Sequence, residues 1–250
     1  VTYPQPAPGA LPGWRFPDGT VLVKTFSLEM EAGNPKSARR LETRILHHER
    51  MPGEENQYGA QVWRGYTYVW NGEQTDATLL PSGGLNQEFT VRDSAAPGGS
   101  RKQVWRFPSR AECTLCHTMA SKYVLGVNTL QMNKNHDYHG VVANQLDTLN
   151  HLGIFSKPLP KPVAQYPQLA DYDDKKAKLA DRARSYLHAN CSHCHRKWGG
   201  GNAEFQLLAS LPLNETGTLN TPPGQGKFGL QQPALLVAGK PEQSLIYHRM

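Results

Sequence analysis

The chain has 250 residues, a length that suits one large domain or two smaller ones. Its formal net charge is +6 and its hydrophobic content is 38%. It contains no apolar run of about 18 residues, so no transmembrane segment is predicted. It also has no compact basic run with interleaved aromatic residues, so nothing indicates nucleic-acid binding. The chain starts at Val1 without an initiator Met, as expected of a processed or trimmed N-terminus.

The N-terminal half is predicted to be rich in β-strands. Residues 1–13 are rich in Pro and Gly and predict an extended arm. The pair Asn71-Gly72 between two strand-like runs predicts a two-residue type I′ hairpin turn. Short β-rich runs separated by Gly, Pro and Asn predict an antiparallel β-sandwich-like domain over residues 1–107. The expected strands cover residues 20–26, 41–46, 66–70, 77–80, 88–91 and 103–107.

The character of the sequence changes after Pro108. Apolar residues at helical spacing predict a helix over 141–152, and Gly153 suits its C-cap. Four prolines between 157 and 168 predict a linker. A second helix is expected from Asp173 or Asp174 to about Asn190. Its apolar stripe is expected to be formed by Leu179, Ala183, Tyr186 and Leu187.

The predicted fold class is therefore α+β, with the β-rich region followed by a mainly α-helical, loop-rich region over 108–250. We divide this second region into three parts around its cysteines. The first part covers residues 108–156, the linker covers 157–170, and the last part covers 171–250.

All four cysteines fall in two copies of one pattern, Cys113-Thr114-Leu115-Cys116-His117 and Cys191-Ser192-His193-Cys194-His195. Cysteines three residues apart lie on one helical turn, so both sulfurs reach the same edge of a porphyrin. The adjacent His then provides an imidazole to the iron. The sequence thus predicts two covalently attached c-type haems. Cys113, Cys116, Cys191 and Cys194 are the expected attachment residues, and His117 and His195 the expected proximal ligands.

Three other uses of the cysteines compete with haem. A Cys₄ zinc site is disfavoured because residues 117–190 separate the pairs, against roughly 15–20 residues in zinc ribbons. Disulfides would leave the two motif histidines unexplained. A thioredoxin-type redox pair needs a βαβ setting, which the surrounding sequence does not offer.

The ligand on the far side of each iron stays open, because several residues have suitable chemistry. Met250 and His248 are candidates at the second haem. Met132, His136, His139 and His151 are candidates at the first, with an open position as a further alternative. Bidentate contacts make Arg106 and Arg110 candidates for binding haem propionates, whereas His193 is expected to face solvent or a propionate. The candidates that we favour are Met132, His136, His139 and Met250.

Seven segments of the chain are informative together, namely 14–26, 41–46, 68–71, 105–113, 125–126, 131–133 and 189–195. They resemble a family of bacterial dihaem c-type cytochrome-like proteins. The resemblance implies a β-rich N-terminal region and a cytochrome c-like C-terminal region. Some members are fused to, or encoded near, quinoprotein sugar or alcohol dehydrogenases, which implies a role as electron acceptor. It also implies that a Met-Pro-Pro stretch and a final helix follow a segment like 241–250.

The predicted function is electron transfer between redox partners in the periplasm or outside the cell, because c-type haems are attached there. The expected partners are other redox proteins, such as a quinoprotein dehydrogenase or a multisubunit membrane or extracellular redox complex. A dihaem peroxidase with one open haem is an alternative, although no distal acid–base constellation is evident. A haem-bearing structural subunit of a larger redox assembly is another.

Overall fold

The computed structural model describes residue 1 and residues 13–49, 62–201 and 204–250. These residues pack into two compact units. The β unit is Phe16–Leu115, and the motif unit combines Val1–Arg15 with Cys116–Met250. The boundary between them lies inside helix α2 (Arg110–Cys116), a little beyond the predicted boundary at residue 107. Most of the predicted N-terminal arm lies outside the described residues.

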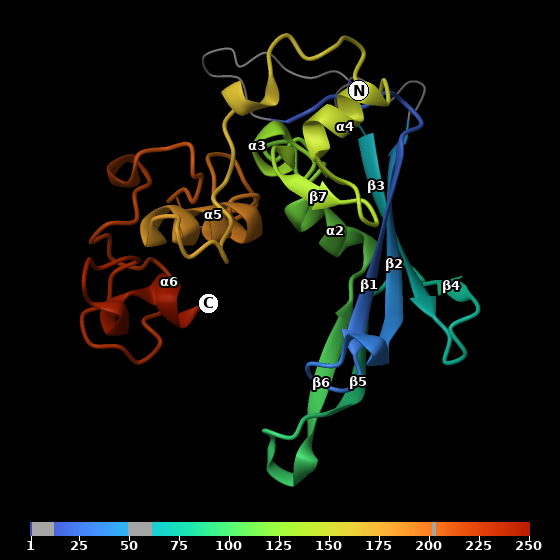
Figure 1. The fold of residues 1–250 in the computed structure, drawn as a ribbon. Helices are drawn as coiled ribbons and strands as arrows, with labels where there is room; N and C mark the ends of the chain where they lie inside the picture. The colour runs from blue at the N-terminus through green and yellow to red at the C-terminus, as the bar shows by residue number, and fades with distance from the viewer. Residues whose placement is uncertain (2–12, 50–61, 202–203) are drawn as a thin grey trace. The chain divides into compact units, whose positions relative to one another are not determined.

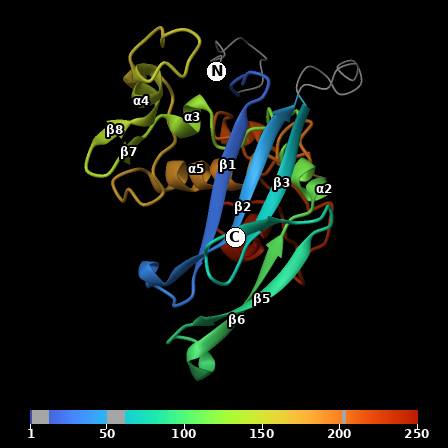
Figure 2. The same ribbon diagram turned by 90° about the vertical axis from the view of Figure 1, so that its right-hand side faces the viewer.

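The predicted mixed α+β class is confirmed, with 22% helix, 27% strand and antiparallel sheets. The main sheet of the β unit has four antiparallel strands in chain order, and Figure 2 shows β1, β2 and β3 side by side. The register shifts between Phe26 and Ser27, which marks a bulge in β1. The four strands are β1 (Val21–Glu29), β2 (Ala38–Glu49), β3 (Val62–Trp70) and β4 (Ala77–Leu79).

A separate antiparallel hairpin, β5 (Leu85–Arg92) and β6 (Ser100–Phe107), completes the β unit (Figure 1). The backbone of Arg92 bonds to the loop after β1, since its N–H donates to Met30 O at 2.9 Å and its carbonyl accepts from Ala32 N at 2.8 Å. The Trp105 indole donates to the Glu42 carboxylate of the main sheet at 3.0 Å. Phe107 and Val91 of the hairpin are fully buried, so the hairpin contributes to the core of this unit.

The connection between β3 and β4 differs from the predicted two-residue turn. Trp70 pairs with Ala77, so the loop covers residues 71–76. The Asn71 carboxamide accepts hydrogen bonds from the backbone N–H groups of Thr75 and Asp76. Gln74, rather than Gly72, adopts a positive φ, of 62°. The prediction of a type I′ turn was wrong because the Asn71 side chain organises a longer loop.

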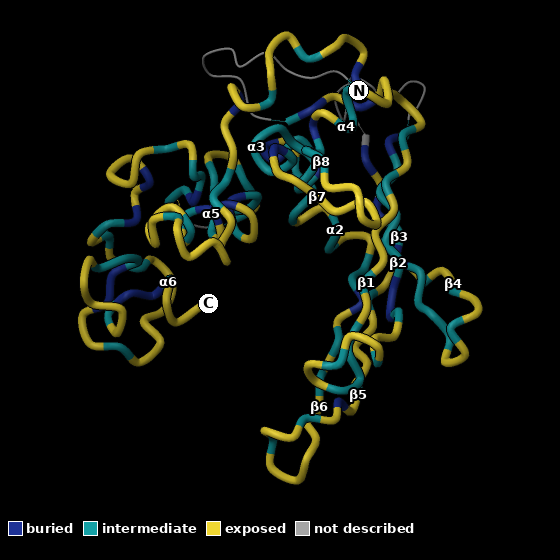
Figure 3. Tube along the Cα trace, in the orientation of Figure 1, coloured by how far each residue is buried: buried dark blue, intermediate teal, exposed yellow. Residues whose placement is uncertain are grey.

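The motif unit consists of short elements joined by long loops. Its core includes Trp14, Leu146 and Phe155, and the ring of Trp14 meets that of Phe155 edge-on at 5.1 Å. Exposed residues follow much of its trace in Figure 3. The elements are α3 (Thr129–Met132), β7 (Asn135–Asp137), β8 (Val142–Asn144), α4 (Gln145–His151), α5 (Leu179–Cys191) and α6 (Leu245–His248), with short 3₁₀ turns η3 (Val163–Gln165), η4 (Leu213–Glu215) and η5 (Pro241–Gln243).

Both predicted helices of this unit are shorter at their N-terminal ends than expected. The first is α4, which starts at Gln145 because Val142–Asn144 pairs with β7 and Asn144 caps the helix. Gly153 follows the helix with a φ of 67°, as its predicted capping role requires. None of the helices in the described part of the chain is long and apolar enough to cross a membrane.

The second predicted helix is α5, which begins at Leu179 rather than at Asp173 or Asp174. The carboxylate of Asp174 instead closes a local turn by accepting from Lys176 N. The predicted apolar stripe of this helix was also wrong. Leu179 is 73% exposed and Ala183 is exposed, whereas Ser185 and His188 are buried.

Candidate functional site

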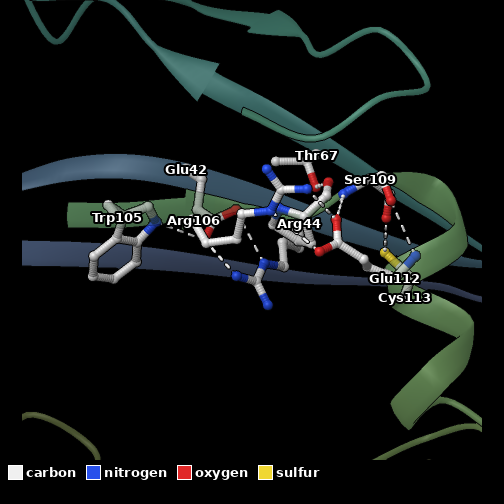
Figure 4. Close-up of polar contacts among 9 residues, drawn as sticks. Glu42, Arg44, Thr67, Trp105, Arg106, Ser109, Glu112 and Cys113 are labelled. Carbon is white, nitrogen blue, oxygen red and sulfur yellow. Dashed lines mark hydrogen bonds and ion pairs between the residues drawn. The ribbon is translucent and has the colours of Figure 1, made fainter. Parts of the chain in front are cut away.

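The helix that carries the first cysteine pair starts with a capping box. The N–H of Glu112 donates to the Ser109 hydroxyl at 3.1 Å, and the N–H of Ser109 donates to the Glu112 carboxylate at 2.7 Å. This reciprocal pair satisfies two N–H groups that a helix start leaves without partners. The Thr67 hydroxyl of β3 donates to the carbonyl of Pro108 at 3.2 Å (Figure 4). The start of α2 is thereby fixed to the main sheet of the β unit.

Arg106 also binds the Glu112 carboxylate. Its guanidinium donates to both oxygens of Glu112, at 3.2 and 2.8 Å. The pKa of Glu112 is lowered to about 2, first by Arg106 and then by the Ser109 N–H and hydroxyl. Arg110 lies over the ring of Tyr66 at 5.1 Å. The two arginines predicted to bind propionates therefore both have partners within the β unit, and their role toward haem stays a prediction.

Cys113 packs against Gly65 of the main sheet, where only a glycine leaves room for it. A Cβ added to Gly65 of β3 would lie 2.6 Å from the Cys113 sulfur and 2.7 Å from its Cβ, closer than real Cβ atoms approach other atoms. The thiol contacts the Ser109 carbonyl at 3.5 Å. Burial raises the pKa of this thiol, and the nearby Arg44 partly opposes the shift. Gly65 therefore sets where the Cys113 sulfur lies.

The ring of His117 is oriented by a backbone carbonyl. Its Nδ1 lies 2.5 Å from the carbonyl oxygen of Tyr123. A carbonyl only accepts, so Nδ1 carries a proton and, in the neutral ring, Nε2 keeps its lone pair. The backbone of Lys122 and Tyr123 is left-handed, with φ of 58° and 63°. Two consecutive non-glycine residues in this region store strain, and here they belong to the tight loop that presents the Tyr123 carbonyl.

The second motif begins at the end of α5, as the sequence predicts. Cys191 is the last residue of the helix, and its carbonyl accepts from Cys194 N at 3.2 Å and from His195 N at 2.9 Å. The helical turn therefore continues through the motif. Arg196 secures the segment by donating to Ser192 O at 2.8 Å and to Ala120 O at 2.9 Å.

His195 is held differently from His117. Its ring stacks on Phe205 with centroids 4.4 Å apart and an interplanar angle of 13°. Its Nδ1 is buried and has no hydrogen-bond partner among the described residues. A Cβ on Gly199 would lie 2.2 Å from the Cys194 carbonyl oxygen, so this glycine permits the loop after the motif to pass close to it.

The two motifs meet in the motif unit. The sulfurs of Cys116 and Cys194 lie 4.0 Å apart. The ligand atoms of Cys116, His193 and Cys194 all lie within 4.8 Å of one another. Burial, and next the Cys116 thiol, raises the pKa of Cys194 to about 11. His193 is half-buried, and burial lowers its pKa. His193 therefore lies in this three-residue cluster rather than facing solvent, and the alternative of a propionate contact stays a prediction.

The candidates for distal ligands are dispersed. Met132 ends α3 and is half-buried, whereas His136 in β7 and His139, with a φ of 59°, are exposed. Met250 is 65% exposed. The Nε2 of His248 bonds to the carbonyl of Glu242 at 3.0 Å. The distal positions of both motifs therefore stay a matter of prediction.

The residues of the first motif fit a c-type haem. Cys113 and Cys116 lie one turn apart on α2, and none of the four motif cysteines is in a disulfide. The imidazole of a haem ligand characteristically donates its second N–H to a carbonyl or carboxylate, which leaves the other nitrogen for the metal. His117 has this arrangement. At the second motif the cysteine spacing fits in the same way, but His195 Nδ1 has no corresponding acceptor among the described residues.

Sequence reasoning missed three parts of this site. The pattern Ser109-x-x-Glu112 is a capping-box signal that predicts the start of α2. Gly65 and Tyr123 carry no such signal, because their roles depend on contacts between distant or tightly turned segments.

Comparisons with known proteins returned no matching family model, no matching curated protein and no matching solved structure.

Proposed function

We propose that this chain is a dihaem c-type cytochrome that transfers electrons between redox partners outside the cytoplasm. One haem is attached at Cys113 and Cys116 and the other at Cys191 and Cys194. His117 and His195 are the protein ligands to the irons. When bound, the haem iron supplies a reversible one-electron change between its ferrous and ferric states.

The hydrogen bond between His117 Nδ1 and the Tyr123 carbonyl is the observation that most supports this proposal. It fixes the tautomer that a ligating imidazole needs, in a histidine that directly follows a cysteine pair one helical turn apart. The capping box and the Gly65 contact add rigidity, since they hold the helix that carries the first pair. The chain's own contribution is thus to position two sulfurs and one nitrogen.

The proposed partners are other redox proteins, such as a quinoprotein dehydrogenase or a membrane-bound or extracellular redox complex. A cytochrome of this kind accepts an electron from one partner and passes it to another without chemistry on a substrate. The chain is therefore proposed to be an electron carrier rather than an enzyme, and to work in the periplasm or outside the cell.

The test is to produce the chain in an exporting host that has a cytochrome c maturation system. Intact mass and a pyridine haemochrome spectrum are expected to show two haems per chain. The double variant Cys113→Ser/Cys116→Ser and its counterpart Cys191→Ser/Cys194→Ser should each retain one. A chain without added porphyrin mass would contradict the proposal. A high-spin resting spectrum together with peroxide turnover would instead indicate that the protein is a dihaem peroxidase.

A second candidate function is a thiophilic metal site formed by Cys116, His193 and Cys194. The observation in its favour is the convergence of their three ligand atoms within 4.8 Å, because thiolate and imidazole are the usual ligands of Zn²⁺. Haem attachment would consume both thiols, so the two functions exclude each other. Stoichiometric zinc in the purified chain, lost in His193→Gln and kept in His248→Gln, together with no porphyrin mass would favour the metal site.

A further inference from the structure

The motif unit contains a cavity of about 690 Å³ between α5 and the segment that follows the first motif. This volume lies in the range of about 300–1,000 Å³ that is typical of small-molecule sites. None of the described residues that line it is a motif cysteine, His117 or His195. Leu125, Leu130 and Leu169 give its wall an apolar part. Ser192 and His193 of the second motif also line it, so the cavity adjoins this motif without including the atoms that would attach or ligate haem.

The cavity wall also contains more positive than negative side chains. Arg184, Arg196 and Lys161 line it, against one carboxylate, Asp181. Arg184 donates to the carbonyls of Leu208 and Leu211, and Arg196 to those of Ser192 and Ala120.

Neither guanidinium has an ion-pair partner within the ranges that the structure describes. A guanidinium stays charged in proteins, and a half-buried one without a counter-anion is unfavourable. An anion in the cavity would offset this cost.

His188 adds a neutral donor to the same wall. It is only 6% exposed, and its Nδ1 accepts the N–H of Ala209 at 3.1 Å. The proton of the neutral ring therefore lies on Nε2. Burial, followed by the charges of Arg196 and Arg184, lowers the pKa of His188 to about 4, so the ring is neutral at pH 7. Two guanidiniums and one imidazole N–H thus offer donors only.

We propose that this cavity binds a carboxylate on an apolar molecule. Arg184, Arg196 and His188 donate hydrogen bonds to the carboxylate, and Leu125, Leu130 and Leu169 contact the apolar body. Two sources share this chemistry, namely a free small organic acid and a propionate of the haem attached at the second motif. The proposal rests on donors and a cavity that the chain's own residues form, so it can be tested with and without haem.

The test uses two probes of the same shape, 1-naphthoate and its neutral analogue 1-naphthamide. Each is titrated calorimetrically into the haem-free chain and into the haem-loaded protein. The haem-free chain should bind naphthoate about tenfold or more tightly than naphthamide, because charge-assisted hydrogen bonds to a guanidinium are the strong ones. Arg184→Gln should remove most of this preference. Arg182→Gln, on the same helix but outside the cavity, should leave it unchanged.

The outcomes separate the two sources. Naphthoate binding to both forms indicates a free organic acid as the ligand, whereas binding to the haem-free chain alone indicates that a haem propionate occupies the site. Equal affinity for naphthoate and naphthamide in the haem-free chain would overturn the proposal, and this comparison in the unaltered chain does not depend on whether a variant folds. If no haem attaches to the chain, the proposed function fails, but the titration of the haem-free chain still tests the cavity.

Discussion

Single residues decide where the motif sulfurs lie. Gly65 lies in the middle of β3, where glycine weakens a strand because it has no side chain to pack. Its benefit is the close approach of Cys113, which any larger residue would prevent. A glycine in a strand interior is thus explained here by the helix that packs on it.

The first prediction concerns Gly65→Ala. The added methyl would lie 2.6 Å from the Cys113 sulfur, so α2 must shift and the first attachment should become inefficient. Intact mass of the exported protein should show mainly chains with one haem, which peptide mapping places at Cys191 and Cys194. Gly72→Ala is the matched control, since its nearest neighbour would be 3.9 Å away. Two haems per chain in Gly65→Ala, as in the control, would refute the role assigned to Gly65.

At the scale of elements, α2 depends on the electrostatics of its first turn. Glu112 is ionised when folded, with its pKa lowered to about 2 from 4.5 by Arg106 and Ser109. A lowered pKa means that the charged carboxylate stabilises the folded chain above pH 4.5. This contribution is lost as the pH falls from about 4.5 toward 2. The first turn of α2 should therefore be sensitive to acid.

The second prediction follows from this pH dependence. Urea unfolding of the haem-free chain should show Glu112→Gln to be less stable than the unaltered chain at pH 6, with the difference shrinking between pH 4.5 and about 2. In an Arg106→Gln background the same substitution should have a smaller effect, because the main cause of the shift is gone. A stability difference that does not change with pH would show that the charge of Glu112 is not what holds the helix start.

The other helix, α5, shows why its apolar stripe could not be predicted. Its buried residues are Ser185 and His188, whose side chains accept hydrogen bonds from the backbone of Ala170 and Ala209. Hydrophobic periodicity finds a helix face that packs against apolar residues. It does not identify a helix face whose polar side chains bond to loop backbone and line a cavity. The helix and its end at the cysteine motif were predictable, but the side that it buries was not.

For the whole molecule, the strand-forming runs could be predicted from local sequence, whereas turn details and long-range contacts could not. The strands of the β unit follow runs of β-branched and aromatic residues, and the mixed α+β class followed from them. The loop at Asn71 differs from the prediction because a side chain competes with the shorter turn. The approach of Cys116 to Cys194 depends on how residues 117–190 fold, and spacing along the sequence carries no information on that.

Haem attached at both motifs should also give the protein a distinctive circular dichroism spectrum. The sulfurs of Cys116 and Cys194 are 4.0 Å apart, so two haems attached to them would be neighbours. Circular dichroism of the haem-loaded protein should therefore show a two-signed signal in the Soret region, which arises when two porphyrin transitions couple. Each double Cys→Ser variant should give a single-signed signal. A single-signed spectrum from the protein with both haems would contradict this expectation.

The same short distance affects the order of events during assembly. Before haem arrives, Cys116 and Cys194 are placed to lose two electrons and two protons to an oxidant such as oxidised glutathione and to form a disulfide between motifs. The pKa of about 11 at Cys194 keeps its thiol protonated at neutral pH, and only the thiolate reacts. We expect a cross-linked 116–194 peptide to form slowly at pH 7 and faster at pH 9, and not in Cys194→Ser. In the proposed function, protonation of one thiol would thus give the chain time to receive its haems.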